Sequence, residues 1–314
     1  MAKNNFKPFA TGAGANVTSQ ADWEALTALL TGFQSGKAAS AQVNKALRQG
    51  TVMASVIGQF IADSTGQDVL DNGNTSVVLT NFLNALKANT NGRLLNVRTF
   101  TASGTYIPTA GTKKVRVRLV GGGGGGGGAA ANTTSGTFSF GYGGSSGCYG
   151  DSGMIDASSI TTVAVTVGSA GTGGVGAGNG TSGGNSSFGS FITAQGGPGG
   201  NGGASTTAGT AVYISNPANT GSCTGTNIML SIPGGGFGGQ VSLGNITYTQ
   251  IKGGEGGSSM MGFGGNGGNA SVPARSGTGY GAGGAGASAL FAQSTAANNG
   301  GNGSAGVVVI EEYA

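Results

Sequence analysis

The chain has 314 residues, of which 70 are glycine, and only 8% are charged. Average chains carry roughly 7% glycine and about a quarter charged residues, so this composition fits neither a conventional enzyme interior nor a charged disordered tail. Histidine is absent, which excludes Ser-His-Asp and Cys-His nucleophile systems, histidine-ligated zinc and an imidazole general base. We expect no enzyme activity, no cofactor and no metal site.

The net charge of +4 is unevenly distributed along the chain. Residues 1–118 hold twelve of the 14 basic and five of the 10 acidic residues, so the surplus lies in the N-terminal part. Its one cluster is at 113–118, where Lys114, Arg116 and Arg118 alternate with apolar residues at the strand period. This pattern predicts the solvent face of a strand, and we do not expect nucleic-acid binding.

Targeting and cysteine signals are weak. The start of the chain lacks an apolar signal-peptide core, and no run of 18 apolar residues occurs, so we expect synthesis in a cytoplasm and no membrane insertion. Cys148 and Cys223 are too few for a disulfide framework or a four-cysteine metal site. Two free thiols are the simpler interpretation, and a single disulfide that pins two neighbouring loops is the alternative.

Glycine content changes abruptly near residue 91, with eight glycines up to Thr90 and 62 after it. The region 1–90 is predicted to be helical. A first helix is expected after Ser19, which resembles the start of a capping box with Asp22. Apolar residues then recur at helical spacing, namely Trp23, Leu26, Leu29, Leu30 and Phe33.

Two further helices are expected, at 40–63 and 75–87. The second of these has Val78, Phe82 and Leu86 on one side. The helix at 40–63 has apolar or small residues at alternating spacings of four and three, which is the seam of a short coiled coil. The seam predicts either a symmetric contact in a larger assembly or an ordinary core helix; its residues are Val43, Leu47, Gly50, Ala54, Ile57 and Ile61.

From Arg93 onward the apolar period becomes two, which predicts β-strands. The predicted strands are Val97–Thr101, Lys113–Val120, Thr162–Val167 and Val307–Glu312. If Val115–Val120 pairs with Val307–Ile310, the glycine-rich stretch between them leaves and returns at one base. We therefore expect a strand base formed by 93–120 and 306–313.

The glycine runs between these strands keep a period of three. Eight consecutive glycines at 121–128 open the region, and Gly168, Gly171, Gly174, Gly180 and Gly183 fall in one frame. Three residues per turn is the period of the polyproline-II helix, which has no internal hydrogen bonds. Six prolines exclude a collagen-like solution, and the phasing and the apolar interruptions argue against a flexible linker.

The remaining solution is a bundle of polyglycine-II helices over 121–305, packed closely because glycine has no Cβ. The predicted architecture is an α-helical N-terminal attachment region, 1–90, followed by a glycine-rich domain, 91–314, with a β-strand base, a polyglycine-II bundle and protruding loops. Such a bundle offers few side chains, so recognition must reside in the segments that interrupt the glycine runs.

These interrupting segments are rich in tyrosine, phenylalanine and methionine, beside serine, asparagine and glycine, which is also the palette of antibody loops. We interpret them as receptor-contact loops, although half of their aromatic residues could instead cover the bundle. Phe263 and Tyr280, embedded in glycine triplets, are expected to be structural. The candidate contact residues are Phe138, Phe140, Tyr142, Tyr149, Tyr213, Met229, Tyr248, Met260, Met261, Arg275 and Phe291.

Other motifs carry little weight. A G-x-G-x-x-G match at 171–176 is expected by chance at this glycine density, and no P-loop occurs. Asp151 and Asp156 are the one close acid pair among the glycine runs. A Gly-Ser context predicts turn residues there more readily than the two carboxylates of a glycosidase.

Two stretches resemble a known family, the bacteriophage tail-fibre proteins with a glycine-rich receptor-binding domain. RTFTASGTYIPTAGTKKVRVRLVGGGGGGGGA and the terminal GGNGSAGVVVIEEYA resemble the opening and closing of glycine-rich phage fibre domains. The segment TGAGANVTSQADWEALTALLTGFQSGKAASAQVNKALRQGTVMASVIGQFIAD is similar to the virion-attachment region of tail fibres in phages of enteric bacteria. The triplet runs are also similar to the distal adhesins of T-even phages.

The resemblance implies a homotrimeric fibre in the virion, attached to phage tail or baseplate proteins by 1–90. Its loops would bind an outer-membrane protein or a surface glycan of the host. A purely structural bundle of the ice-binding type is the first alternative; it would need flat, regular Thr or Ala faces, and the long irregular loops disfavour it. A surface-glycan depolymerase is the second, disfavoured by the scarcity of acids.

Overall fold

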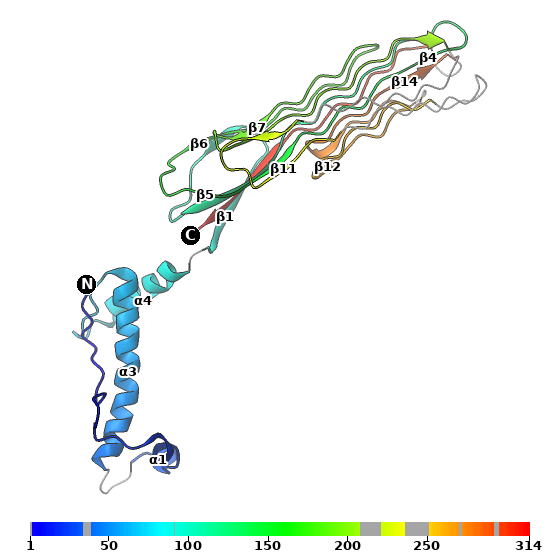
Figure 1. Cartoon of the computed structure of the whole chain (residues 1–314). Coiled ribbons are helices and arrows are strands. Elements are labelled where there is room, and N and C mark those ends of the chain that lie inside the picture. Colours follow the sequence, from blue (N-terminus) through cyan, green and yellow to red (C-terminus); the bar gives the residue numbers. More distant parts are fainter. Residues whose placement is uncertain are drawn as a thin grey trace. The chain divides into compact units, whose positions relative to one another are not determined.

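The computed structural model describes residues 2–33, 39–90, 92–207, 221–235, 251–269, 272–291 and 295–314. The chain divides into two compact units, Met1–Asn91 and Gly92–Ala314, at the change in glycine content (Figure 1). The first is helical and the second is built from antiparallel β-sheets and glycine-rich segments. In the described part of the chain, no helix is long and apolar enough to cross a membrane.

The helices of the first unit begin with two short pieces where one helix was predicted. Ser19 caps the first as expected, its Oγ accepting the amide of Asp22 at 3.1 Å. Among the predicted apolar residues, Trp23 is buried whereas Leu30 is 93% exposed, so no packing stabilises a continuous helix here. The helices are α1 (Gln20–Glu24), α2 (Ala28–Thr31), α3 (Ser40–Thr65) and α4 (Thr75–Asn89).

The small core of this unit lies at the C-terminal end of α3. Ile61 is fully buried there beside Val69 and Ala85, with the predicted Val78 and Phe82 packed against them. The predicted helices at 40–63 and 75–87 are confirmed. The interpretation of the α3 seam as part of an ordinary core helix therefore holds for the last turn of the seam, at Ile61.

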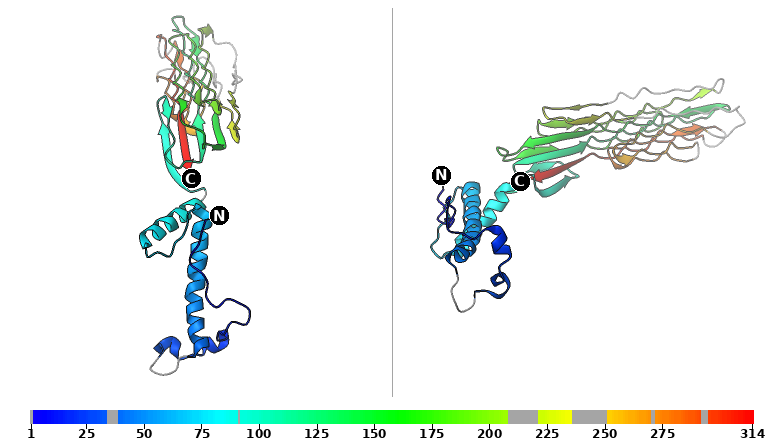
Figure 2. Two further views of the ribbon diagram at one scale, coloured as in Figure 1. Left: turned by 90° about the vertical axis from the view of Figure 1, so that its left-hand side faces the viewer. Right: turned by 60° about the horizontal axis from the view of Figure 1, so that its bottom comes forward.

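The second unit contains a sandwich of two antiparallel five-stranded sheets (Figure 2). The first sheet has the order β1 (Leu94–Phe100), β15 (Val307–Tyr313), β3 (Lys114–Val120), β5 (Tyr149–Asp156) and β11 (Leu230–Ile232). The second has the order β10 (Cys223–Thr224), β8 (Ile192–Ala194), β7 (Ser186–Phe188), β6 (Val163–Thr166) and β2 (Gly104–Tyr106).

Alternation along β3 produces the core between the two sheets. Val115, Val117 and Leu119 are fully buried, while the basic residues between them are not, as the sequence predicted. The pairing of Val120 with Val307 confirms that the glycine-rich stretch leaves and returns at one base. Phe188 of the second sheet lies in the same core.

Beyond the sandwich, glycine-rich segments run side by side around the central segment 121–128 (Figure 1). Every amide from Gly121 to Gly128 donates to a backbone carbonyl. The accepting carbonyls belong in turn to three antiparallel segments, 142–148, 178–184 and 298–304. Each of these segments therefore meets the centre at every third residue, as Gly122, Gly125 and Gly128 do with Gly184, Thr181 and Gly178.

The carbonyls of the central segment accept with the same period. Amides of three parallel segments, 171–174, 197–203 and 284–287, donate to them. The centre is thus bonded to six neighbours, three as donor and three as acceptor. This arrangement satisfies backbone groups that have no bonding partner within their own segment.

Asparagine side chains complete the hydrogen bonding at the surface of these segments. Asn185 Oδ1 accepts the amide of Gly196 at 2.9 Å, and Asn302 Oδ1 accepts that of Gly173 at 2.8 Å. Asn179 Oδ1 does the same for Gly202 at 2.8 Å. Outward amides that no backbone carbonyl reaches are therefore paired with side-chain amides.

Three short strands lie at the end of the glycine segments far from the sandwich (Figure 1). They are β4 (Thr137–Phe140), β14 (Ser288–Leu290) and β9 (Thr206–Thr207). A separate two-stranded ribbon is formed by β12 (Met261–Phe263) and β13 (Thr278–Tyr280).

A buried carboxylate joins β15 to the chain around β2. Glu312 is fully buried and accepts hydrogen bonds from the hydroxyl of Tyr106 at 2.8 Å and the amide of Thr109 at 3.0 Å. Burial raises the pKa of Glu312, but these bonds and the hydroxyl of Thr109 outweigh it, so its pKa lies below the usual value. The pKa of Tyr106 is raised, by burial first and then by Glu312.

We predict that Glu312→Gln destabilises the second unit by about 1–3 kcal/mol at pH 7, because the charge-assisted bonds are lost. The ionised carboxylate is favoured by folding, so its contribution is present above the unfolded pKa of about 4.3 and lost as pH falls through the lower folded pKa. Calorimetry between pH 7 and pH 3 should show the difference shrinking. Glu255→Gln, in an exposed pair with Lys252, is the control, and a pH-independent difference would contradict this account.

We predict that Gly126→Ala disrupts the second unit. A Cβ there would lie 1.8 Å from the carbonyl oxygen of Ala285, which is backbone and cannot rotate away. The expected loss is about 3 kcal/mol or more in the calorimetric unfolding of this unit. Gly235→Ala is the matched control, since nothing lies within 4 Å of its Cβ position, and equal losses in the two variants would refute the close-packing argument.

Candidate binding surface

The ribbon of β12 and β13 brings apolar side chains to one of its faces. Met261 pairs with Tyr280 and Phe263 with Thr278, so these four side chains share a face, and glycines occupy the middle pair. Phe263 is 78% and Tyr280 37% exposed. We call this face, formed by Met261, Phe263, Thr278 and Tyr280, the ribbon face.

Hydrogen bonds attach the ribbon firmly to its surroundings. Ser259 Oγ donates to the carbonyl of Tyr280 at 2.5 Å and accepts the amide of Met261 at 3.0 Å. The next residues continue into the glycine segments, where the amide of Gly265 donates to Gly283 at 3.0 Å and that of Gly281 to Ala305 at 2.7 Å. The ribbon face is therefore displayed from a fixed backbone.

The expectation that Phe263 and Tyr280 are structural is wrong. Their neighbours in sequence are glycines, which form the bonded frame, but the strand alternation turns both rings outward. Met260, predicted as a contact residue, is 62% exposed in the turn before β12, and the predicted Met261 is half-buried. Met261 and Phe263 alternate with Gly262 at the strand period, and the sequence analysis did not use this signal for a strand with an exposed ring.

Three of the predicted contact residues are enclosed. Phe138 and Phe140 stack at 6.3 Å between ring centroids and pack with Ile251, and Tyr149 is 9% exposed within β5. The side chains that interrupt glycine runs must also fill the space where the runs end, and these three do so. They are removed from the candidate contact residues.

The other candidates are dispersed over the second unit. Met229 is 60% exposed and Arg275 is exposed, whereas Tyr142 and Phe291 are half-buried. Tyr142 packs edge to face with Phe140 at 5.8 Å, and burial raises the pKa of its hydroxyl. Tyr213 and Tyr248 lie outside the described residues.

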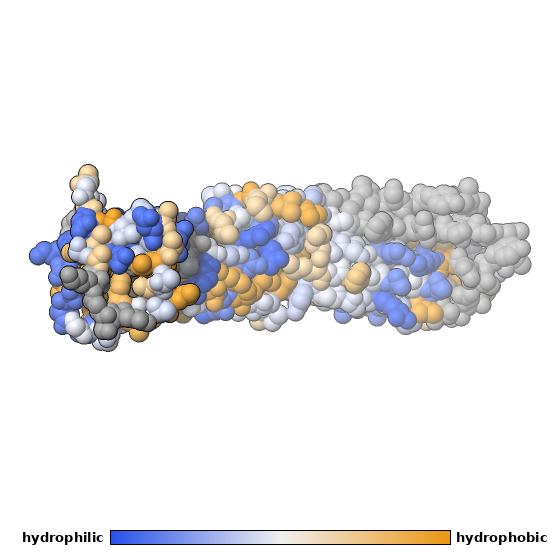
Figure 3. All heavy atoms as spheres, turned by 90° about the horizontal axis from the view of Figure 1, so that it is seen from below, coloured by the Kyte–Doolittle hydropathy of each residue, from blue (hydrophilic) through white to orange (hydrophobic). Residues whose placement is uncertain are grey.

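Hydrophobic residues reach the surface in several places on the face shown in Figure 3. Within the described part of the second unit, the ribbon face gathers several of them on paired strands, and a second group lies around β11 and β5, where Met154, Met229 and Leu230 are exposed. Others stand alone, such as Val175, which is 75% exposed on a glycine segment. Single exposed apolar residues are normal on any protein, whereas a cluster marks a candidate contact surface.

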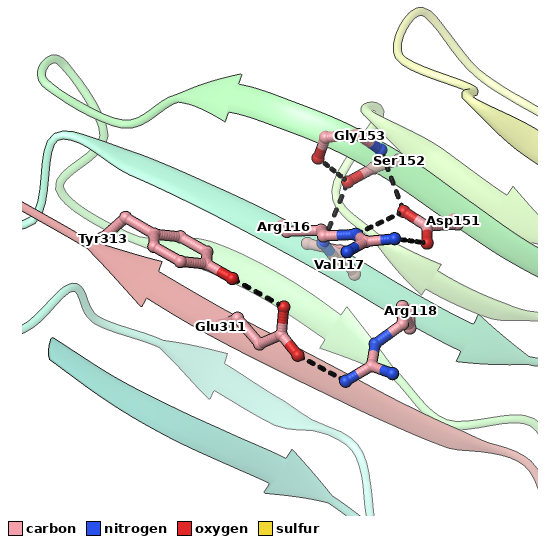
Figure 4. A network of polar contacts seen from close by, with 8 residues as sticks. All are labelled: Arg116, Val117, Arg118, Asp151, Ser152, Gly153, Glu311 and Tyr313. Carbon is pink, nitrogen blue, oxygen red and sulfur yellow. Dashed lines mark hydrogen bonds and ion pairs between the residues drawn. The ribbon is translucent and has the colours of Figure 1, made fainter. Parts of the chain in front are cut away.

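Ion pairs neutralise the basic cluster on the outer face of the first sheet (Figure 4). Arg116 Nε donates to Asp151 at 3.0 Å, Arg118 pairs with Glu311, and the hydroxyl of Tyr313 donates to Glu311 at 2.9 Å. Burial raises the pKa of Asp151, but the hydrogen bonds from Arg116 and from the amide of Gly153, together with the charges of Arg116 and Arg118, outweigh it, so the net pKa is lowered. These ion pairs join β3 to β5 and to β15.

Asp151 and Asp156 both make hydrogen bonds within the sandwich. Asp151 is a strand residue bound to Arg116, so its interpretation as a turn residue is wrong, while Asp156 accepts the amide of Ser158 at 2.9 Å at the end of β5. Among the described residues, no group of three or more His, Cys, Asp or Glu side chains could hold a metal ion.

The two cysteines form a disulfide between Cys148 and Cys223, with Cα atoms 6.3 Å apart. Of the two interpretations of the sequence, the structure has the bridge and not the free thiols. Cys148 precedes β5, and Cys223 lies in β10 at the edge of the second sheet.

Comparison with known protein families matches residues 99–313 to the glycine-rich domain family. The match covers more than half of the chain, and the chain belongs to this family. No curated protein matches the sequence. The matched region begins in β1 and ends in β15, so it spans both the sandwich and the glycine segments.

Proposed function

We propose that the chain is a bacteriophage tail-fibre protein that adsorbs to a receptor on the bacterial surface through side chains displayed by its glycine-rich domain. The observation that carries the proposal is the ribbon face, where the 78% exposed Phe263 shares a strand face with Met261 and Tyr280 on a hydrogen-bonded frame. Exposed aromatic and methionine side chains on a rigid support are typical of binding surfaces. The proposal assigns no catalytic step to the chain.

The frame is proposed to be a bundle of polyglycine-II helices. Along 121–128, every third amide donates to the same neighbouring segment, and this repeat supports a helix with three residues per turn. Cβ positions along this segment fall within about 2 Å of neighbouring carbonyls, as at Gly123, where the distance is 1.9 Å. Only glycine permits that approach, which explains why the segments tolerate so few side chains.

The proposed receptor is an outer-membrane protein or a surface glycan of the host. The ribbon face would supply the apolar anchors, and Met229, Met260 and Arg275 are the exposed candidates outside it. The strands of the ribbon, Met261–Phe263 and Thr278–Tyr280, contain no charged residue, so the ribbon itself brings no net charge to the contact.

The N-terminal unit is proposed to attach the fibre to phage tail or baseplate proteins and to form a homotrimer, which places the protein in the virion after synthesis in the host cytoplasm. The seam of α3 supports self-association, because Leu47 is 49% and Ile57 43% exposed in the single chain. An apolar seam at alternating spacings of four and three is the pattern through which helices pair.

We predict that Phe263→Ser reduces binding of the full chain to a susceptible bacterium by about tenfold or more, because the ring is an anchor. The measurement is binding of labelled protein to a panel of enteric bacteria that lack individual surface components. Val175→Ser is the matched control, equally exposed but outside the ribbon face. Full binding by the Phe263 variant would remove the ribbon from the contact, and absence of any binding across the panel would overturn the proposed function.

The same preparation distinguishes the alternative functions. A structural ice-binding protein would bind no cells and would show thermal hysteresis. A depolymerase would release polymer from treated cells. Either outcome replaces receptor binding as the function of the ribbon face.

We predict that Ile57→Asp dissociates the homotrimer, raising the dissociation constant at least about tenfold by placing a charge in the seam. Val56→Asp is the control, since Val56 is 58% exposed but lies away from the seam on the same helix. Sedimentation equilibrium gives the oligomeric state of each variant. A wild-type chain that is monomeric at all concentrations would contradict the trimer.

A further inference from the structure

Residues 221–235 form a strap that contributes one strand to each sheet. Its β10 pairs with β8 at the edge of the second sheet, and its β11 pairs with β5 at the edge of the first. The strap therefore closes one side of the sandwich between two sheet edges. We keep the name strap for these residues.

The strap is held by few backbone bonds. The amides of Thr226 and Asn227 both donate to the carbonyl of Phe191, at 3.1 and 3.2 Å, and the amide of Met229 donates to Asp151 at 2.8 Å. The paired strands are two and three residues long. Such short pairings are weak unless side chains also anchor them.

Side-chain anchoring of the strap rests on one residue. Among the strap residues, all of which the structure describes, Cys223 has the one buried side chain, whereas Met229 and Leu230 are 60% and 44% exposed. Its partner Cys148 is fully buried in the core of the sandwich. The disulfide thus occupies the place where other strands have hydrophobic anchors.

The surroundings of the bridge are shaped to receive it. A Cβ on Gly150 would lie 2.9 Å from the Sγ of Cys223, so a larger residue in β5 would displace the bridge. Ser231 Oγ lies 3.7 Å from the Sγ of Cys148 and accepts the amide of Cys223 at 3.2 Å. β10, β11 and β5 therefore meet at the sulfur atoms.

We propose that the Cys148–Cys223 bridge is a redox lock that fastens the strap to the sandwich only after the protein leaves a reducing compartment. That timing rests on the proposed function, since a phage protein is made in a reducing cytoplasm and acts outside the cell. In the dithiol state the strap keeps its short pairings and a few hydrogen bonds, such as that from the amide of Gly235 to the hydroxyl of Ser146 at 2.9 Å, and it opens more readily than in the disulfide state. In the disulfide state it is covalently tied to Cys148, the residue directly before β5.

The chemistry is thiol–disulfide exchange with a small-molecule disulfide such as oxidised glutathione. Cys223, at a sheet edge and 8% exposed, attacks first as thiolate, which breaks the glutathione S–S bond, forms a mixed disulfide and releases one glutathione. The thiolate of Cys148 then attacks the sulfur of Cys223 and releases the second glutathione. The protein loses two electrons and two protons, and the glutathione disulfide gains them.

The disulfide keeps the strap paired with β8 and β5. Without the strap, β8 and β5 become sheet edges with unpaired backbone groups, which promote pairing with other chains.

The test uses the full chain purified from a reducing cytoplasm without air, before and after addition of oxidised glutathione. We expect mass spectrometry after alkylation to find two free thiols before and none after. Hydrogen exchange of peptides covering 222–231 should slow by roughly tenfold or more on oxidation, while β3 stays unchanged. Equal exchange in the two states, or thiols that stay free in glutathione disulfide, would overturn the lock.

The paired substitution Cys148→Ser and Cys223→Ser serves as the second variant. It should exchange like the dithiol state and ignore glutathione disulfide, with β3 exchange reporting that the sandwich is intact. If it does not fold, the comparison of reduced and oxidised wild-type chain still decides. No step needs a bacterium, so failure of the lock and failure of receptor binding are separate results.

Discussion

Close approach of backbones without side chains is the constraint on which the second unit depends. Gly121 to Gly128 have Cβ positions about 2 Å from neighbouring carbonyls, and their amides all donate to other segments. Each bond adds only about 0.5–1.5 kcal/mol net, and glycine carries a large ordering cost, so single segments cannot be stable alone. The segments are therefore stable only as a set, held at one end by the sandwich.

The same constraint decides where recognition chemistry can lie. Where the glycine segments pack with their Cα atoms against one another, no room is left for side chains between them. Side chains therefore lie where the glycine runs end or where a pair of strands leaves the packed segments. At the far end, Phe138 and Phe140 turn inward and seal a small core with Ile251. In the ribbon of β12 and β13, alternation turns Phe263 outward, which makes it the lead contact in the proposed function.

The sandwich supplies the fixed end of the frame through several independent contacts. β3 and β15 pair over their whole length, the buried Glu312 ties the chain around β2 to β15, and the bridge at Cys148 ties the strap to both sheets. The ion pairs of Arg116 and Arg118 add support on the outer face. Charged residues are thus scarce in this chain and placed where strands must stay in register.

The sequence alone determined the change at residue 91, the three main strands of the base and the helices after Ser40, because these follow from composition and local periodicity. The pairing of Val120 with Val307 was a conditional expectation, and the tertiary structure decided it. Only tertiary structure decided which aromatic residues are exposed, since inward and outward rings, such as Phe140 and Phe263, share the same glycine-rich surroundings in sequence. It also decided the pairing of Cys148 with Cys223, which depends on two sheet edges meeting across 75 residues of chain. Periodicity fixes a local backbone, whereas burial and cross-linking depend on which distant segments arrive at the same place.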